Sequence, residues 1–192
     1  MNGAQPAMSD ALRLRKTPAT ALGLLLELQP PLADRLRGCH RTALRVEQLA
    51  ASRLGPPSTT MTSTQARLLA MDTAALRELS LHAGAVRHAR AVLSLIDGLS
   101  LRTLAANLGP GARGAALRWR ELAAGGPDPS VGAPLANLAA RDGLRCLHAW
   151  CDRQPSAIGM RVRLLVPPGA SAEGEEAALG ARIVDALGGE DV

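Results

Sequence analysis

The sequence contains no Phe and no Tyr, and its only aromatic residues are Trp119 and Trp150. Strands favour aromatic and β-branched side chains, so this absence argues against a β-rich fold. Leu and Ala supply the core instead, and both residues are good helix formers. Because 47% of the 192 residues are hydrophobic, the chain is too apolar to be disordered and long enough to bury a core. We therefore expect an all-α protein.

Cysteine is scarce, with Cys39, Cys146 and Cys151 as its only occurrences. An odd and small number of cysteines does not make a disulfide framework, and it fits a reducing cytoplasm. No apolar run reaches the roughly 18 residues that a transmembrane helix needs. These absences predict a cytoplasmic protein without a membrane span.

Lysine is nearly absent, because Lys16 is the only one, and arginine carries the positive charge. Residues 1–165 hold 21 Arg and Lys against 11 Asp and Glu, whereas residues 166–192 hold one Arg against six acids. This asymmetry predicts a basic body and an acidic tail. The body suits an acidic protein, an anionic membrane face or nucleic acid. A GC-rich genome also explains a preference for Arg and Ala, and it is the simpler explanation.

Proline, glycine and capping residues divide the chain into helical segments. Thr17-Pro18 predicts a first helix that stops at Pro30-Pro31, and residues 55–60 form the clearest linker. Gly84 is a weak point in one long segment, and Ser100 is the expected cap of the next. The expected helices after the first span residues 32–54, 64–70, 72–96, 101–108, 112–124, 134–153, 155–163 and 173–187.

Three regions follow from this division. We expect a flexible N-terminal segment over residues 1–16 and a single orthogonal helical bundle domain over residues 17–167. An acidic C-terminal tail with a short helix occupies residues 168–192.

The segment from Gly109 to Gly114 matches the G-x-G-x-x-G dinucleotide-binding pattern literally. That mechanism needs a strand before the glycines and a helix start whose N–H groups face a phosphate. Here a helix is expected before Gly109, and Pro110 has no N–H. The segment is therefore interpreted as a corner between two helices.

Cys146, His148 and Cys151 form a C-x-H-x-x-C cluster. Residues two apart on a helix point about 200° apart, so Cys146 and His148 do not converge on one ion, and a structural zinc site needs a fourth ligand. A buried Cys146 and an exposed His148 are the simpler interpretation. We expect no metal and no cofactor.

Catalytic motifs are equally absent, since the sequence has no G-x-S-x-G, H-E-x-x-H or P-loop. Glu78 with His82, and His148 with Asp152, lie four residues apart, which is the spacing of ordinary surface pairs on a helix. His88 has no acid at helical spacing. We expect a protein that is not an enzyme.

The segment 101–120 fits a DNA-binding helix-turn-helix, because Ala105 and Gly109 lie four residues apart and Arg118 and Arg120 are placed to meet phosphates or bases. Pro110 and the three glycines loosen this turn. Helix corners in Ala- and Leu-rich bundles have the same pattern. A DNA-binding regulator is therefore the alternative function.

The region from Asp72 to Pro167 resembles the SctK (YscK/PscK) family of type III secretion proteins, and more distantly the Hrp-type counterparts of plant pathogens. The resemblance rests on the order of degenerate features over about half the chain and on no catalytic signature. The matching stretches are ALRELSLHAGAVRHARAVLSLIDG (75–98), LSLRTLAANLG (99–109), AALRWRELA (115–123) and LRCLHAWCDRQPSAIGMRVRLLVPP (144–168).

This resemblance implies a cytoplasmic adaptor of the sorting platform, peripheral to the inner membrane. Family members link the cytoplasmic domain of an inner-membrane ring protein to the pods that carry the ATPase complex. A basic body suits an acidic docking partner. The candidate partner-binding residues are Arg118, Arg120, Arg161 and Arg163. Nucleic acid is the less favoured partner.

Overall fold

The structure is a computed structural model that describes residues 19–55, 60–124 and 133–189. Every regular element in these ranges is helical and none is a strand, which confirms the all-α prediction. No helix within them combines the length and the apolar character that crossing a bilayer requires. The expected flexible segment 1–16, the cap at Thr17-Pro18 and most of the 55–60 linker lie outside the described residues.

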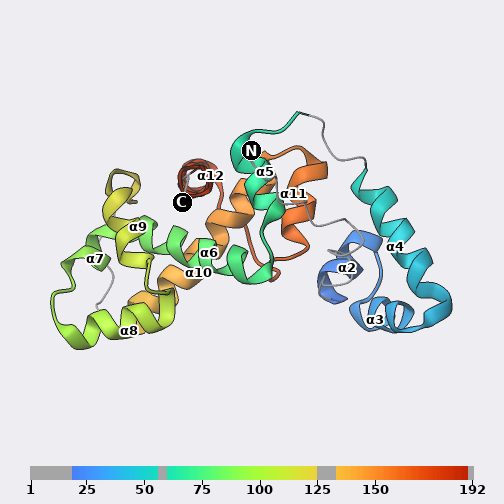
Figure 1. The fold of residues 1–192 in the computed structure, drawn as a ribbon, viewed down its shortest axis with the longest axis horizontal. Helices are drawn as coiled ribbons and strands as arrows, with labels where there is room; N and C mark the ends of the chain where they lie inside the picture. Colours follow the sequence, from blue (N-terminus) through green and yellow to red (C-terminus); the bar gives the residue numbers. More distant parts are fainter. Residues whose placement is uncertain (1–18, 56–59, 125–132, 190–192) are drawn as a thin grey trace, which may run out of the picture. The chain divides into compact units, whose positions relative to one another are not determined.

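The chain divides into two compact units (Figure 1). The first unit combines residues 1–73 with 154–168, and the second combines residues 74–153 with 169–192. This division does not test the predicted domain boundaries at residues 17 and 167, which stay a prediction.

The first unit packs its helices around a Leu- and Ala-rich core. Its helices are α2 (Ala19–Leu26), α3 (Pro30–Gly38), α4 (His40–Leu54), α5 (Ser63–Ala70) and α11 (Ser156–Arg163). The buried apolar residues that form this core are Leu22, Leu25, Leu26, Ala33, Val46, Ala50, Leu54 and Leu164. A capping box starts α5, because the Thr62 hydroxyl accepts a hydrogen bond from Gln65 N while Gln65 Oε1 accepts one from Thr62 N.

The helix predicted over residues 32–54 is wrong in two respects. Pro30 begins α3 instead of ending the preceding helix, because proline fits the first turn, where an N–H has no helical partner. The helix then breaks at Cys39, whose backbone is extended. The Thr42 hydroxyl donates to the Leu36 and Cys39 carbonyls, so it satisfies acceptors that the break releases.

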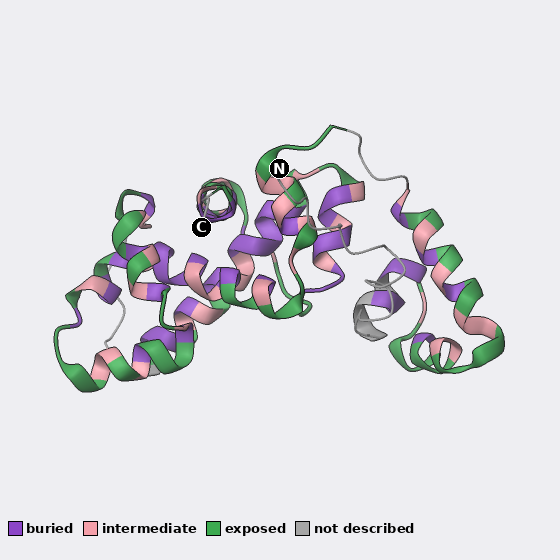
Figure 2. Cartoon of the chain, viewed as in Figure 1, coloured by how far each residue is buried: buried purple, intermediate pink, exposed green. Residues whose placement is uncertain are grey.

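The second unit is built on two crossing helices, α6 (Thr73–Arg87) and α10 (Ala133–Arg153) (Figure 1). The other elements of this unit are α7 (Ala89–Ser94), α8 (Gly98–Leu108), α9 (Ala112–Arg118), the 3-10 helix η1 (Arg120–Leu122) and α12 (Gly174–Gly188). Figure 2 shows buried residues along α6 and α10. Members of the apolar core beside them include Ala85, Val92, Leu104, Leu108, Ala116, Leu135 and Ala139.

Glycine sets how closely α6 and α10 approach. A Cβ atom on Gly84 would lie 1.8 Å from the Ala139 carbonyl oxygen, and one on Gly143 would lie 1.8 Å from the Ser80 carbonyl oxygen. No side chain fits at either position, so the two backbones are in direct contact. The prediction that Gly84 splits the long helix is wrong, because α6 continues through Gly84 and packs closely against α10 there.

The long helix ends instead at Arg87, and His88 has a non-helical backbone with φ −103° and ψ 29°. The Arg87 carbonyl accepts a hydrogen bond from Ala124 N at 3.0 Å. The cap of α8 is also corrected, because Asp97 rather than Ser100 is the N-cap, and its carboxylate accepts from Ser100 N at 2.8 Å. The end of α6 is therefore bonded to a residue remote in sequence, and the start of α8 is capped by a side-chain carboxylate.

The predicted C-terminal helix exists as α12, and it packs along α10. A Cβ on Gly180 would lie 3.0 Å from the Cys146 Cα atom, so the two helices approach closely there. Trp150 Nε1 donates to Asp185 Oδ1 at 2.7 Å across the same interface. This segment is acidic, as expected, and it is also part of the second unit's packing.

Candidate partner-binding surface

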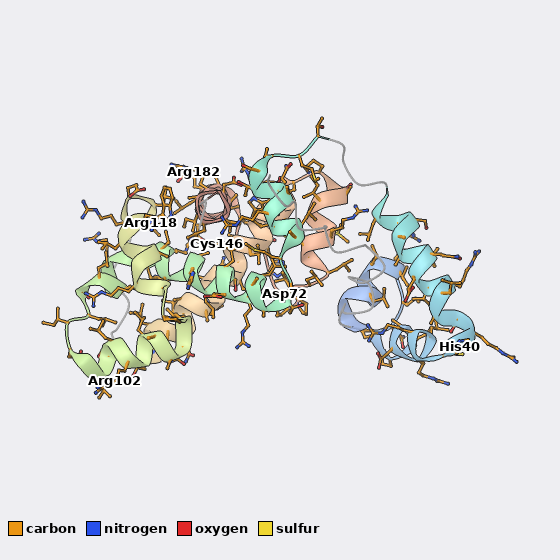
Figure 3. The ribbon with its side chains drawn as sticks, in the orientation of Figure 1. His40, Asp72, Arg102, Arg118, Cys146 and Arg182 are labelled. Atoms are coloured by element: carbon orange, nitrogen blue, oxygen red, sulfur yellow. The ribbon has the colours of Figure 1, made fainter. Side chains whose placement is uncertain are left out.

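Arg118 and Arg120 lie at the junction of α9 and η1, and both are exposed. Arg118 is the last residue of α9 and is labelled in Figure 3. Trp119 between them has φ −112° and ψ 29°, which ends the α-helix and starts the 3-10 turn. The local geometry therefore places two exposed arginines within one turn of chain.

Arg161 has a different environment from these two arginines. Its side chain is only 4% exposed, and its guanidinium donates to the Gly55 carbonyl at 2.7 Å and to the Leu54 carbonyl at 3.3 Å. These carbonyls belong to the C-terminal end of α4, where helical donors are missing. Arg161 therefore joins α11 to α4 inside the first unit. Its predicted role in partner binding stays a prediction.

Arg163 is half-buried, two residues further along α11. Residues two apart on a helix point about 200° apart. Arg161 and Arg163 therefore do not form a common surface, whereas Arg118 and Arg120 are both open to solvent.

The glycine-rich segment is a corner between two helices, as predicted. Helix α8 ends at Leu108, Gly109 has φ +89°, and α9 begins at Ala112. The buried side chains at this corner are Leu104, Leu108, Ala112 and Ala116. Ala105 is exposed, so it does not occupy the helix–helix contact that a helix-turn-helix needs at this position.

Cys146 is buried, as predicted, and burial raises the pKa of its thiol to about 11. His148 is also buried, at 2% exposed, so the expectation of an exposed imidazole is wrong. Gly169 packs against this ring, since a Cβ there would lie 3.2 Å from His148 Nε2. No group of three metal-ligating side chains converges in the part of the chain that the structure describes. The expected lack of a metal stays a prediction.

A charge network around a buried carboxylate, which the sequence analysis did not identify, lies where α6, α10 and α12 meet. Its centre is Asp142, which is 6% exposed. His88 Nε2 lies 3.0 Å from Asp142 Oδ2, and Arg141 Nε donates to Asp142 Oδ1 at 3.1 Å. Arg145 also belongs to the network, because its Nη1 atom lies 3.7 Å from Asp142 Oδ1. Arg87 extends the network to α12, because its Nη2 atom lies 3.0 Å from Glu176 Oε1.

The electrostatics of this network favour the charged form of Asp142. Burial raises the pKa of this carboxyl, but hydrogen bonds from His88 and Arg141 and the charges of both residues outweigh it and hold the pKa below its ordinary value. The hollow beside it is lined by Arg87, Asp142, Arg145, Cys146 and Ala172. The Cys146 thiol there is largely protonated at neutral pH, so this geometry supplies a clamp between helices and no activated nucleophile.

One sequence signal does point to this network. Asp142 lies three residues after Ala139 and four before Cys146, so it shares their buried helix face. A charged residue on such a face needs a partner. The partner His88 lies 54 residues away, where helical spacing gives no information about it.

Comparison of the chain with protein-family models, with curated proteins and with solved structures found no match. A function for this chain is therefore argued from the side chains described above and from the order of sequence features over residues 72–167.

Proposed function

We propose that this chain is a non-enzymatic adaptor of a bacterial type III secretion system, acting in the cytoplasm beside the inner membrane. The observation that carries the proposal is the exposed pair Arg118 and Arg120, which lies inside the region whose order of features resembles the SctK family. The proposed partners are the cytoplasmic domain of an inner-membrane ring protein and a pod protein.

Charge supports an adaptor role. A basic surface raises the rate of encounter with an acidic protein and fixes the register of docking. The charge network around Asp142 supports it in a second way, because ion pairs of Glu176 with Arg87 and Arg145 connect α12 to α6 and α10. A rigid helical unit of this kind presents a surface to a partner.

The experiment uses the bacterium that encodes the chain. We expect deletion of the gene to abolish secretion of type III substrates, and the wild-type chain to restore it. Arg118→Glu with Arg120→Glu is expected to fold normally and to lose co-purification with ring and pod proteins. The matched control is Arg41→Glu with Arg45→Glu, which makes the same charge change at two exposed arginines of α4. Normal secretion in the deletion strain would overturn the proposal.

A DNA-binding regulator is the alternative, and the exposed Ala105 disfavours it. A protein that neutralises several phosphates loses affinity for duplex DNA with a log–log salt slope of about −0.9 per contact. For an adaptor we expect only weak DNA binding without sequence preference. Site-selective binding at nanomolar concentration and physiological salt, abolished by the Arg118/Arg120 double change, would establish the alternative.

A further inference from the structure

The outer face of α9 carries an apolar side chain among arginines. Leu117 is 57% exposed, although leucine is usually buried, and Arg118 follows it in sequence. Arg113 lies four residues before Leu117 and therefore on the same side of the helix. Arg120 extends the charged rim into η1. We call Arg113, Gly114, Leu117, Arg118 and Arg120 the α9 face.

Gly114 leaves bare backbone in this face. Of the three glycines in the segment 109–114, the fold accounts for the first two. Gly109 has φ +89°, which favours glycine, and a Cβ on Gly111 would lie 2.9 Å from His82 Cε1. A Cβ on Gly114 would meet nothing within 4 Å. Glycine inside a helix costs about 1 kcal/mol relative to alanine, and no contact with the residues that the structure describes requires it here.

The position of this glycine matters for binding. Gly114 lies three residues before Leu117 and four before Arg118, so the bare backbone borders both side chains. A partner helix can approach such a position closely and place one apolar side chain against Leu117. Arginines at the rim then bind carboxylates by charge-assisted hydrogen bonds.

The charge balance around the α9 face selects the partner. On the α9 face and in the adjoining η1 the basic residues are Arg113, Arg118 and Arg120, and the acid is Glu121. This excess complements an acidic protein segment. An apolar centre distinguishes the face from a phosphate-binding surface, because Leu117 offers no donor to a phosphate.

We propose that the α9 face binds an acidic amphipathic helix of a partner protein, with one apolar side chain of that helix lying in the space above Gly114 and against Leu117. The inference names the partner chemistry for the adaptor role and rests on that proposed function. An amphipathic partner helix is recognised through apolar anchors at helical spacing, and the surrounding charges add specificity.

The binding test uses the full chain and a labelled peptide. The probe is an acidic amphipathic helix of about 15 residues, with Leu along one face and Glu elsewhere. A second peptide has the same composition in an order that destroys the apolar face. We expect the chain to bind the first peptide measurably more tightly than the second in fluorescence anisotropy.

Two substitutions examine the centre of the face. Gly114→Leu adds a side chain where a Cβ has no neighbour within 4 Å, and it is expected to weaken binding about tenfold. Leu117→Ala is expected to weaken binding about fivefold. The matched controls are Gly98→Leu, also an open glycine, and Leu44→Ala, a leucine that is 64% exposed on α4. Both controls are expected to bind the peptide as the wild type does.

Several outcomes would overturn the proposal. Equal affinity for the two peptides would show attraction by charge alone, and absence of binding would remove the site. Tighter binding to duplex DNA or to phosphatidylglycerol vesicles, weakened by the same two substitutions, would assign the face to another class of partner. The secretion assay separates this inference from the proposed function. Normal secretion by a Gly114→Leu strain, with none in the deletion strain, would overturn only the α9 face.

Discussion

The position that a Cβ atom would take on Gly84 lies 1.8 Å from the Ala139 carbonyl oxygen, so α6 and α10 cross with backbone against backbone. Gly143 repeats the relationship with Ser80 on the other side of the crossing. Both obstacles are main-chain oxygens, which cannot rotate away as a side chain can. The crossing consequently depends on two glycines rather than on apolar volume.

Gly84→Ala and Gly143→Ala are each expected to destabilise the protein by at least about 2 kcal/mol, because the added methyl group forces the helices apart. Denaturant unfolding followed by circular dichroism at helical wavelengths measures the change. Gly114→Ala is the matched control. It adds the same methyl group to a helix in open space and is expected to be neutral or stabilising. Equal behaviour of the three variants would contradict the crossing.

Low pH is expected to lower the stability of the second unit, because Asp142 becomes protonated. The pKa of this carboxyl is lower in the folded protein than its ordinary value of 3.8, so the folded state releases the proton more readily than the unfolded state. The resulting stabilisation is fully present above the unfolded pKa and is lost as the pH falls through the folded pKa. Melting temperatures are expected to fall in that acidic range.

Asp142→Asn examines the same carboxylate at neutral pH. We expect the free energy of unfolding to fall by about 2 kcal/mol, because the hydrogen bonds from His88 and Arg141 lose a charged acceptor and Arg87 loses one of its carboxylate neighbours. Its melting temperature is also expected to depend less on pH in the acidic range. Asp34→Asn is the control, since Asp34 pairs with Arg37 in an exposed i,i+3 pair, whose loss costs about 0.5 kcal/mol. If the melting temperature of Asp142→Asn falls with acid as much as that of the wild type, the role of Asp142 in acid sensitivity is refuted.

The three thiols are expected to react at very different rates. Cys39 is exposed, and hydrogen bonds from the Thr42 side chain and from the Arg41 and Thr42 backbone lower its pKa. Cys146 and Cys151 are buried. A chromogenic disulfide reagent at mildly alkaline pH should therefore modify one thiol quickly and the other two only on unfolding. Cys39→Ser should remove the fast phase, and a fast phase that survives this change would contradict the burial of the other two.

Arg161→Ala is expected to destabilise the first unit by about 3 kcal/mol, because the α4 carbonyls lose charge-assisted hydrogen bonds while remaining partly buried. Thermal unfolding measures this effect. Arg45→Ala removes an exposed arginine of α4 and is expected to change stability by less than about 0.5 kcal/mol. A stable Arg161→Ala protein that fails to bind ring or pod proteins would instead support the predicted binding role of this residue.

Helix content was predictable because Leu and Ala recur at helical spacing and the sequence is poor in strand-favouring residues. The interruption at His88 was not, since the groups beside it have partners remote in sequence: His88 contacts Asp142, and the Arg87 carbonyl accepts a hydrogen bond from Ala124 N. Gly84 illustrates the same limit. Its low helix propensity is a local property, whereas its close contact with Ala139 is set by tertiary packing.

The binding role of the four candidate arginines stays a prediction, but their surroundings differ from the sequence pattern. The sequence placed Arg118 and Arg120 inside a helix expected over residues 112–124, whereas α9 ends at Arg118 and Arg120 begins η1. The burial of Arg161 was not predicted, because an arginine's burial cannot be read from its charge. The buried position of His148 depended on Gly169, which follows the helix at a distance in sequence. The network around Asp142 required three helices to be brought together before its members could be recognised.

Arg161 also constrains the order of events during protein synthesis. The Leu54 carbonyl receives its guanidinium donor from a residue 107 positions later in the chain. At a translation rate of about 5–20 residues per second, the end of α4 leaves the ribosome several seconds before that donor exists. Until then the nascent first unit lacks α11 and exposes the surface that this helix later covers. A ribosome-bound chaperone has the same several seconds to act on this part of the protein.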